Sequence, residues 1–220
     1  MCGHPLAHTD CKCCQIRERL AHSGVMDQDT EAVIERLNDA LSKSGLSLRQ
    51  FAHALGTSPS RFVAYRAGKT APSAAFLLRA ERIADALSLA REERIPSSID
   101  AVESLRRAAK RGSEDWTYAL ALEIRDRLHD ILQSHRQLSA AWEAQPPPVD
   151  DRWKALTAAF VGHEFSEAGL TPPRWTVTEP LDSEWVLDTP RLTEAQIKEQ
   201  TPAWLAERNI FIAAKDLVTA

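Results

Sequence analysis

Apolar residues recur every three or four positions along much of the chain, which is the spacing of a helix with one buried face. The clearest example is residues 29–43, where Gly45 stands just beyond the last apolar position. The same pattern predicts further helices at about residues 47–54, 58–68, 73–87 and 97–112, with glycine or proline between them. The first half of the chain is therefore expected to be helical.

The next predicted helix is long and spans residues 113–142. Glu114 and Asp115 lie in its first turn, where acidic side chains suit the helix dipole. Its apolar positions follow the four-three rhythm of a helix packed along another helix, broken at His135; they are Ile124, Leu128, Ile131, Leu138 and Trp142. Packing within the chain and the seam of a dimer both fit this rhythm, since fewer than three clean heptads are present.

Three consecutive prolines, Pro146 to Pro148, end the helical pattern and predict a stiff extended spacer. Beyond them, we expect helices at about residues 151–167, 193–200 and 202–208, whereas the closing residues fit a strand or a helix equally. The chain is therefore expected to be mainly α and divided at the prolines. Its predicted parts are an extension (1–26), a helical domain (27–95), a connecting helical segment (96–145) and a small, mostly helical C-terminal module (149–220).

Charge is distributed unevenly along the chain. The formal net charge of −4 would argue against nucleic acid as a partner if it were spread uniformly. Between Gly45 and Arg82, however, six basic residues stand against one acidic residue, a local charge of +5. From Glu143 to Ala220, seven basic residues stand against thirteen acidic ones, a local charge of −6. We therefore expect the two ends of the chain to face different partners.

Residues 47–69 contain the most specific pattern in the chain. The apolar side chains of a first short helix are Leu48, Phe51, Ala52 and Leu55. Gly56 then permits the positive φ angle of a tight turn. Ser58 suits the N-cap of a second helix and Pro59 its first position, where a missing N–H is tolerated. Phe62 and Tyr65 point inward in this second helix, which leaves a more exposed arc of Ser60, Arg61, Val63, Ala64 and Arg66.

Together these residues resemble the helix-turn-helix of the Cro/repressor-type (Xre-family) DNA-binding regulators. The matching positions are Ser47, Phe51, Ala52, Leu55, Gly56, Ser58, Phe62, Gly68, Lys69, Pro72, Ser73, Ile83, Ala84 and Leu87. The resemblance covers roughly residues 29–89 and depends on their joint spacing, because each residue alone is common. It implies an N-terminal helix-turn-helix domain of the five-helix type that binds double-stranded operator DNA.

The resemblance also implies which residues would meet DNA, because the second helix would lie in the major groove. The residues implied to contact bases are Ser60, Arg61 and Ala64. The residues implied to contact phosphates are Arg49, Ser58, Arg66 and Lys69. Pro59 and Ala64 make this helix less polar than the recognition helices of the family.

The C-terminal module combines acidic charge with several tryptophans, which are large side chains favoured in cores and at interfaces. Trp175, Trp185 and Trp204 are the candidate partner-binding residues, with packing in the core of the module as the other interpretation. The leading hypothesis is a transcriptional repressor that acts as a homodimer through the 113–142 helix. A specific version is an antitoxin whose C-terminal module binds a toxin. The alternative is a ligand-sensing regulator whose C-terminal module binds a small molecule.

The four cysteines gather at the start of the chain and invite a zinc interpretation. Their positions are Cys2, Cys11, Cys13 and Cys14, near His4 and His8. Structural zinc sites usually pair two Cys-x₂₋₄-Cys knuckles across a longer loop, and here the second half is missing. We therefore expect a disordered extension without a metal, and zinc binding is the alternative.

Other chemical motifs are incomplete or missing in the sequence. The string from His163 to Glu167 resembles half of a zinc-protease motif, but Glu167 stands where the second histidine would be. Neither a glycine-rich phosphate loop nor a nucleophile-base-acid set is recognisable, so we expect no enzyme and no cofactor. The chain also lacks a run of ~20 apolar residues and an apolar secretory signal, so we expect a cytoplasmic protein with no membrane partner.

Overall fold

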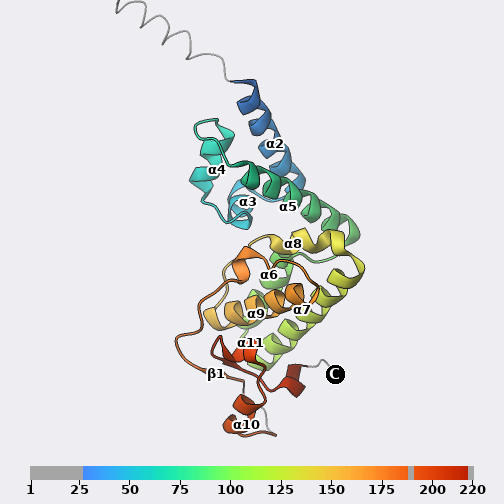
Figure 1. Ribbon diagram of the computed structural model, residues 1–220, viewed down its shortest axis with the longest axis vertical. Coiled ribbons are helices and arrows are strands. Elements are labelled where there is room, and N and C mark those ends of the chain that lie inside the picture. The colour runs from blue at the N-terminus through green and yellow to red at the C-terminus, as the bar shows by residue number, and fades with distance from the viewer. Residues whose placement is uncertain (1–26, 188–190, 218–220) are drawn as a thin grey trace, which may run out of the picture.

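The computed structural model describes residues 27–187 and 191–217, and these are mainly helical, as predicted (Figure 1). The helices are α2 (Gln28–Ser44), α3 (Leu48–Ala54), α4 (Pro59–Arg66), α5 (Ala74–Glu93), α6 (Ser98–Lys110), α7 (Glu114–Ser134), α8 (Ser139–Glu143), α9 (Asp151–Glu167), α10 (Glu194–Glu199) and α11 (Ala203–Ala206). Short 3-10 turns are η1 (Arg136–Leu138), η2 (Arg174–Thr176) and η3 (Ala214–Leu217). The strands β1 (Trp185–Val186) and β2 (Ile210–Phe211) pair in parallel.

Two lobes lie one above the other in Figure 1, and α5 runs from the first into the second. The N-terminal lobe consists of α2 to α5, and its most extensive packing is α2 against α5. Alanines on α5, such as Ala80 and Ala84, are fully buried and let the two helices approach closely. Phe51, Phe62 and Ile83 complete this core without solvent exposure. The lobe therefore has apolar packing of its own.

The C-terminal lobe extends from α6 to η3 and is built around α7, which packs against α6 on one side and α9 on another. Its buried side chains include Leu105, Leu128, Leu156 and Phe160, one or more from each of these helices. At the end of the described chain, the Tyr118 hydroxyl of α7 donates a hydrogen bond to the Asp216 carbonyl at 2.7 Å and holds η3 in place. The closing residues thus form a short strand followed by a 3-10 turn.

The predicted 113–142 helix is shorter than expected, because α7 ends at Ser134. His135 leaves the helical conformation, with φ −132° and ψ 49°, and the chain bends through η1 into α8. The bend returns Leu138 and Trp142 to the interior against α5, so tertiary packing overrides the apparent continuity of the pattern. All five apolar positions of the predicted seam are buried within this one chain. These five positions therefore form no exposed apolar seam for a dimer.

Packing across the three prolines differs from the predicted division of the chain. Helix α9 follows the prolines yet packs against α7, and the Trp175 indole donates a hydrogen bond to the Trp142 carbonyl at 2.9 Å. The segments before and after the prolines therefore share one core, and the prolines connect helices within it. Similarly, α6, which lies in the predicted connecting segment 96–145, packs on α7 and α8 and belongs to the C-terminal lobe.

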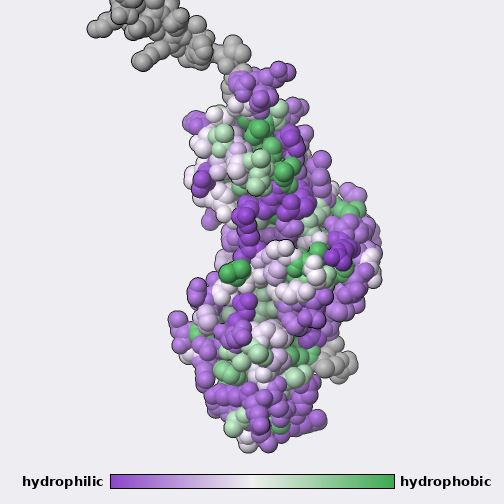
Figure 2. All heavy atoms as spheres, in the orientation of Figure 1, coloured by the Kyte–Doolittle hydropathy of each residue, from purple (hydrophilic) through white to green (hydrophobic). Residues whose placement is uncertain are grey.

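Hydrophilic residues cover most of the face shown in Figure 2, where apolar residues form small separate groups. Within the described ranges, no helix combines the length and the apolar character needed to cross a bilayer. The extension 1–26, with the cysteines and histidines considered for zinc, lies outside the residues that the structure describes.

Candidate functional site

The predicted pair of short helices is present as α3 and α4, and local hydrogen bonds define both ends of the turn between them. Ser47 begins α3 with a capping box, because its backbone N–H donates to the Gln50 side chain at 3.0 Å. Gly56 adopts φ +69° and its N–H donates to the His53 carbonyl at 2.8 Å. Ser58 then accepts a hydrogen bond from the Arg61 N–H at 3.2 Å, with Pro59 in the first turn. These details agree with the sequence prediction.

Aromatic packing fixes how α4 lies against the rest of the N-terminal lobe. The Phe51 ring of α3 and the Phe62 ring of α4 meet edge to face, with centroids 5.6 Å apart, and neither is exposed. On the next turn, Tyr65 packs on Phe76 of α5 with centroids 5.1 Å apart. Helix α4 is therefore anchored from two sides, which leaves its remaining arc facing solvent.

That outward arc contains the residues predicted to contact bases. Ser60 and Arg61 are exposed and Ala64 is half-buried, while Val63 between them is 49% exposed. The Arg61 Nε donates to the Tyr65 hydroxyl at 2.8 Å, which directs the guanidinium along the helix while leaving its outer nitrogens available. The structure thus brings Ser60, Arg61 and Ala64 together on one surface.

The residues predicted to contact phosphates divide into two groups. Arg49 near the start of α3 and Lys69 beyond the end of α4 are exposed, and neither has an ion pair or hydrogen-bonded side-chain partner in the described part of the chain. Ser58 is exposed but is used as the cap of α4. Arg66 is half-buried, and its Nε donates to the Asn38 side chain of α2 at 2.6 Å. Arg66 therefore ties α4 to α2, a role that sequence spacing could not indicate.

The other basic residues of the +5 segment point away from this surface. Arg79 donates to the Leu55 carbonyl at 3.1 Å, and Arg82 forms two hydrogen bonds with the Glu143 carboxylate at 2.6 and 3.2 Å. Glu81, the one acidic residue of the segment, pairs with Arg36 of α2 at 2.5 Å. The exposed charge near α4 therefore comes from Arg49, Arg61 and Lys69, and residues 45–80 contain no carboxylate to oppose it.

The three tryptophans predicted to bind a partner are all engaged within the chain. Trp185 is buried, its ring meets Trp153 edge to face at 5.1 Å, and its indole N–H donates to Glu114 at 3.2 Å. Trp175 is half-buried and bonded to α8, as described above. Trp204 is half-buried and stacks on His163 with centroids 4.3 Å apart. Trp185 is thus a core residue, whereas Trp175 and Trp204 keep part of their surface accessible to a partner.

Two open grooves flank the segment that joins the lobes. One, of about 650 Å³, is lined by the three prolines together with His53, Lys154, Trp175 and Val177. The other, of about 620 Å³, lies between α5, the end of α3 and residues 171–175, and its charged lining residues are Arg79, Arg82, Glu143 and Arg174. Both volumes lie in the range of small-molecule sites. Neither groove was indicated by the sequence, because each is lined by residues from distant segments.

The described residues contain no cluster of three or more His, Cys, Asp or Glu side chains with the geometry to hold a metal ion. His163, which drew attention in the sequence, stacks on Trp204 instead. The exposed His129 of α7 lies 2.9 Å from Glu164 of α9, which is buried, and the two form a single pair. Comparison of the chain with protein-family models, with curated proteins and with solved structures found no match in any of the three.

Proposed function

We propose that this protein is a sequence-specific regulator of transcription that binds double-stranded DNA through α4. The observation that carries the proposal is the outward arc of α4, which is rigidly anchored, free of carboxylates and flanked by exposed cations. A helix presented in this way fits the major groove of DNA. In an acidic chain, concentrating free positive charge around one such helix favours a polyanionic partner at that face.

The proposal gives each residue of the surface a distinct role. Arg61 would donate to guanine, Ser60 would bond a neighbouring base edge and Ala64 would contact a thymine methyl. Arg49 and Lys69 would neutralise phosphates on either side. Arg66, held by Asn38, would act through the position of α4 and not by direct contact.

The experiment that tests this function compares variants on the DNA upstream of the protein's own gene and on unrelated DNA. Arg61→Ala should reduce the preference for the specific site by about 1–3 kcal/mol, whereas Lys69→Ala should weaken both DNAs similarly and lower the salt slope by about one. Arg111→Ala is the control, because Arg111 is exposed on the other lobe. The proposal would be contradicted if the wild-type protein bound neither DNA, or if the wild type and all three variants bound both DNAs alike.

Dimer formation on a two-fold operator would need a surface other than the predicted seam. The apolar side chains of α7 and α8 that were expected to form that seam are buried in the C-terminal lobe. We propose that any homodimer forms through exposed residues or on the DNA itself. Sedimentation of the protein with and without operator DNA measures this. Polar substitution of Leu128 is no test of the seam, because Leu128 is fully buried and its substitution would also unfold the lobe.

A partner protein for the acidic C-terminal lobe is a further part of the proposal. The net charge of −6 over residues 143–220 favours a basic partner, and an antitoxin that represses its own operon is one specific form. Co-expression with the product of a neighbouring gene, followed by purification of the complex, tests this form. Recovery of the regulator alone, with no relief of toxicity, would count against it.

The second candidate is a ligand-sensing regulator, and the two grooves beside the junction of the lobes favour it. A ligand in either groove would contact both the end of α3 and the C-terminal lobe. It could therefore change the affinity of α4 for DNA by changing how the lobes are held. The charged residues of the second groove indicate which class of ligand such a regulator would bind.

A further inference from the structure

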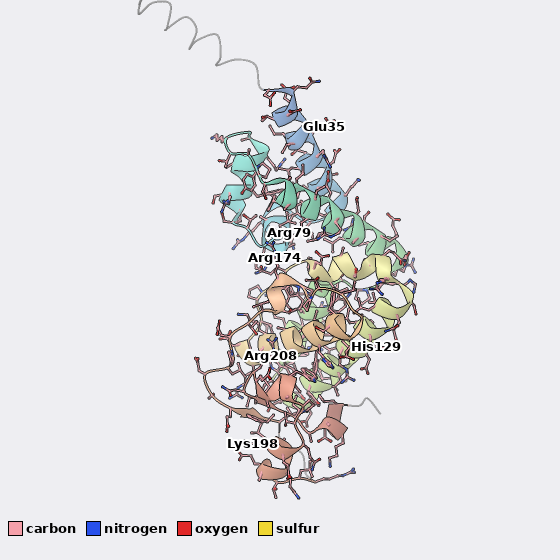
Figure 3. All side chains as sticks on the ribbon, viewed as in Figure 1. Glu35, Arg79, His129, Arg174, Lys198 and Arg208 are labelled. Carbon is pink, nitrogen blue, oxygen red and sulfur yellow. The ribbon has the colours of Figure 1, made fainter. Side chains whose placement is uncertain are left out.

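The groove of about 620 Å³ collects positive charge from both lobes. From the N-terminal lobe come Arg79 and Arg82 of α5, beside Gly56 and the end of α3; from the C-terminal lobe come Glu143 and Arg174. Three guanidinium groups thus share one groove with one carboxylate, in a chain whose net charge is −4. Figure 3 shows Arg79 and Arg174 at the level where the two lobes meet.

The hydrogen bonds in the groove leave its positive charge incompletely balanced. Arg82 is neutralised by its paired contact with Glu143. Arg79 bonds only a neutral acceptor, the Leu55 carbonyl, and lies over the Phe76 ring at 5.5 Å. Arg174 is exposed and has no side-chain hydrogen bond or ion pair among the residues described. Two guanidinium groups therefore retain donors for an external anion.

The surroundings of Arg79 disfavour its cationic form. Burial lowers the pKa of Arg79, the charges of Arg174 and Arg82 lower this pKa further, and the charge of Glu143 opposes them. An arginine whose cationic form is disfavoured by its neighbours gains from a bound negative charge. Sites that hold like charges together in this way are often binding sites.

The fold fixes the side chain of Arg79 and the backbone of Arg174. Arg174 lies in η2, where the Thr176 N–H and hydroxyl donate to the Pro173 carbonyl at 3.0 and 2.8 Å. The neighbouring Trp175 is bonded to the Trp142 carbonyl. Arg79 is fixed by its bond to Leu55. The backbone of the groove is therefore pre-organised, which reduces the entropy lost on binding.

We propose that this groove is the binding site of a small organic anion that bears a phosphate or carboxylate group. Arg79 and Arg174 donate hydrogen bonds to the oxyanion, for which guanidinium groups are well suited. The apolar part of the ligand lies against Leu78, which is 56% exposed, and the rings of Pro172 and Trp175. The size of the groove accommodates a metabolite and not merely an inorganic ion.

Ligand binding here would link the two lobes directly, because Arg79 and Arg174 belong to different lobes. The ligand would also touch the turn at Gly56, which leads into α4. An effect of the ligand on DNA affinity rests on the proposed function. Anion binding in the groove does not, so either DNA binding or anion binding can fail without the other.

Calorimetric titration of the full chain with phenyl phosphate and with benzoate tests the site, and benzyl alcohol serves as the uncharged probe. We expect saturable binding of at least one anion up to about 10 mM, as for a small fragment, and none of the alcohol. Whichever of the two anions binds more tightly shows whether the groove prefers a phosphate or a carboxylate group. Arg174→Gln should weaken its binding at least tenfold, whereas Arg111→Gln on the surface of the same lobe should leave it unchanged.

Arg174→Gln is the decisive variant, because the Arg174 side chain is exposed and forms no hydrogen bond or ion pair with the described part of the chain. Thermal unfolding without probe checks that the variant is folded, and Arg79→Gln gives a second measurement. Equal anion binding by Arg174→Gln and wild type, equal binding of the alcohol, or no saturable binding at all would overturn the proposal. Titration of the same variants with DNA then tests the proposed function separately.

Discussion

Gly45 ends α2 in the left-handed conformation, with φ +65°, and its N–H donates to the Ser42 carbonyl. A second constraint comes from α5, where the Arg91 guanidinium donates to the main-chain carbonyls of Lys43 and Ser44. A Cβ atom at position 45 would lie 2.7 Å from this guanidinium. The backbone conformation therefore favours glycine, and a Cβ atom would displace the Arg91 guanidinium from the carbonyls at the end of α2.

Replacement of Gly45 should accordingly cost more than replacement of a glycine with backbone strain alone. Gly169 is the matched control, because its φ of +67° is similar and nothing lies within 4 Å of a Cβ built there. In urea denaturation, Gly169→Ala should lose about 1–2 kcal/mol and Gly45→Ala clearly more. In an Arg91→Ala background, the two glycine variants should lose similar amounts. A Gly45→Ala loss no greater than that of Gly169→Ala in wild type would show that Arg91 imposes no constraint.

Tyr118 makes the free energy of unfolding sensitive to pH in the alkaline range. The ordinary pKa of the phenol is 10.0, and burial, followed by the charge of Asp216, raises the pKa of Tyr118 in the folded protein. Above about pH 10 the unfolded chain therefore loses a proton that the folded chain keeps. The free energy of unfolding falls as pH rises there, by up to about 1.4 kcal/mol per pH unit for this group.

Comparison with Tyr118→Phe isolates this effect from all other titrations. At neutral pH the variant should be less stable by about 1 kcal/mol, because it lacks the hydrogen bond to the Asp216 carbonyl. The stability difference should stay constant up to about pH 9 and then shrink as pH rises past 10. Denaturant titrations between pH 7 and 11 measure it, on the scale set by the ordinary phenol pKa of 10.0. A constant difference through that range would contradict the shifted pKa.

At the scale of elements, local sequence signals predict where helices begin but not always where they end. Ser58, Ser97 and Thr193 were identifiable as caps because a cap acts within three residues of itself. The end of α7 was missed because nothing local at His135 requires it. The helix stops there because Leu138 and Trp142 pack against α5, and such a contact is written in no short window of sequence.

Ser97 and Ser98 show the same division between local and tertiary signals. Ser97 caps α6 and forms a capping box with Asp100, as a local pattern indicates. Ser98 is fully buried, and its hydroxyl donates to the Ala144 carbonyl at 2.6 Å, with the Ala141 carbonyl at 3.2 Å. It therefore supplies the donor for the end of α8, a role that the sequence could not indicate.

Ser98→Ala should lower the free energy of unfolding by about 1–3 kcal/mol, because it leaves buried carbonyls without their donor. Ser104→Ala makes the same chemical change on the same helix, where Ser104 is only half-buried and bonds an exposed arginine. That control should change stability by less than about 0.5 kcal/mol. Chemical denaturation of both variants measures the contrast. Similar losses for the two serines would show that the bond to α8 is not what matters.

For the whole molecule, the sequence predicted a mainly helical protein, and it did not indicate that the segments before and after the prolines pack together. The prolines follow the end of α8, and α9 after them packs against α7. Residues 145 and 146 also contact the N-terminal lobe. The Gln145 N–H donates to the Ala54 carbonyl at 2.8 Å, and His53 lies 2.9 Å from the Pro146 carbonyl. Composition reports local stiffness, whereas these contacts join residues about ninety positions apart.

The same reason explains which parts of the candidate site were predictable. The arc of Ser60, Arg61 and Ala64 follows from the period of one helix, so spacing alone was enough to place it. The anchoring of Arg66 by Asn38 joins two helices, and the anion groove joins two lobes. Both depend on tertiary structure, so neither could be derived from periodicity.

Because α9 packs on α7, we expect that truncation of the chain at the prolines unfolds the C-terminal lobe. A chain ending at Gln145 lacks α9, so α7 loses the helix that packs against it, and α6 is left on an α7 that is covered on one side only. We expect the truncated chain to bind a hydrophobic dye and to lose hydrogen-exchange protection in α6 and α7. Protection in α2 and α3 should persist, because the N-terminal lobe has its own core.

The control keeps α9 and removes only the stiffness of the spacer, by substitution of Pro146, Pro147 and Pro148 with serine. Because α9 is held by its contacts with α7, this chain should retain exchange protection in both lobes. It should lose stability only through the greater freedom of its unfolded state, by up to about 1 kcal/mol for each proline. Full protection of α6 and α7 in the truncated chain would instead mean that the prolines separate independent modules. The two altered chains therefore distinguish a connection inside one core from a linker between two domains.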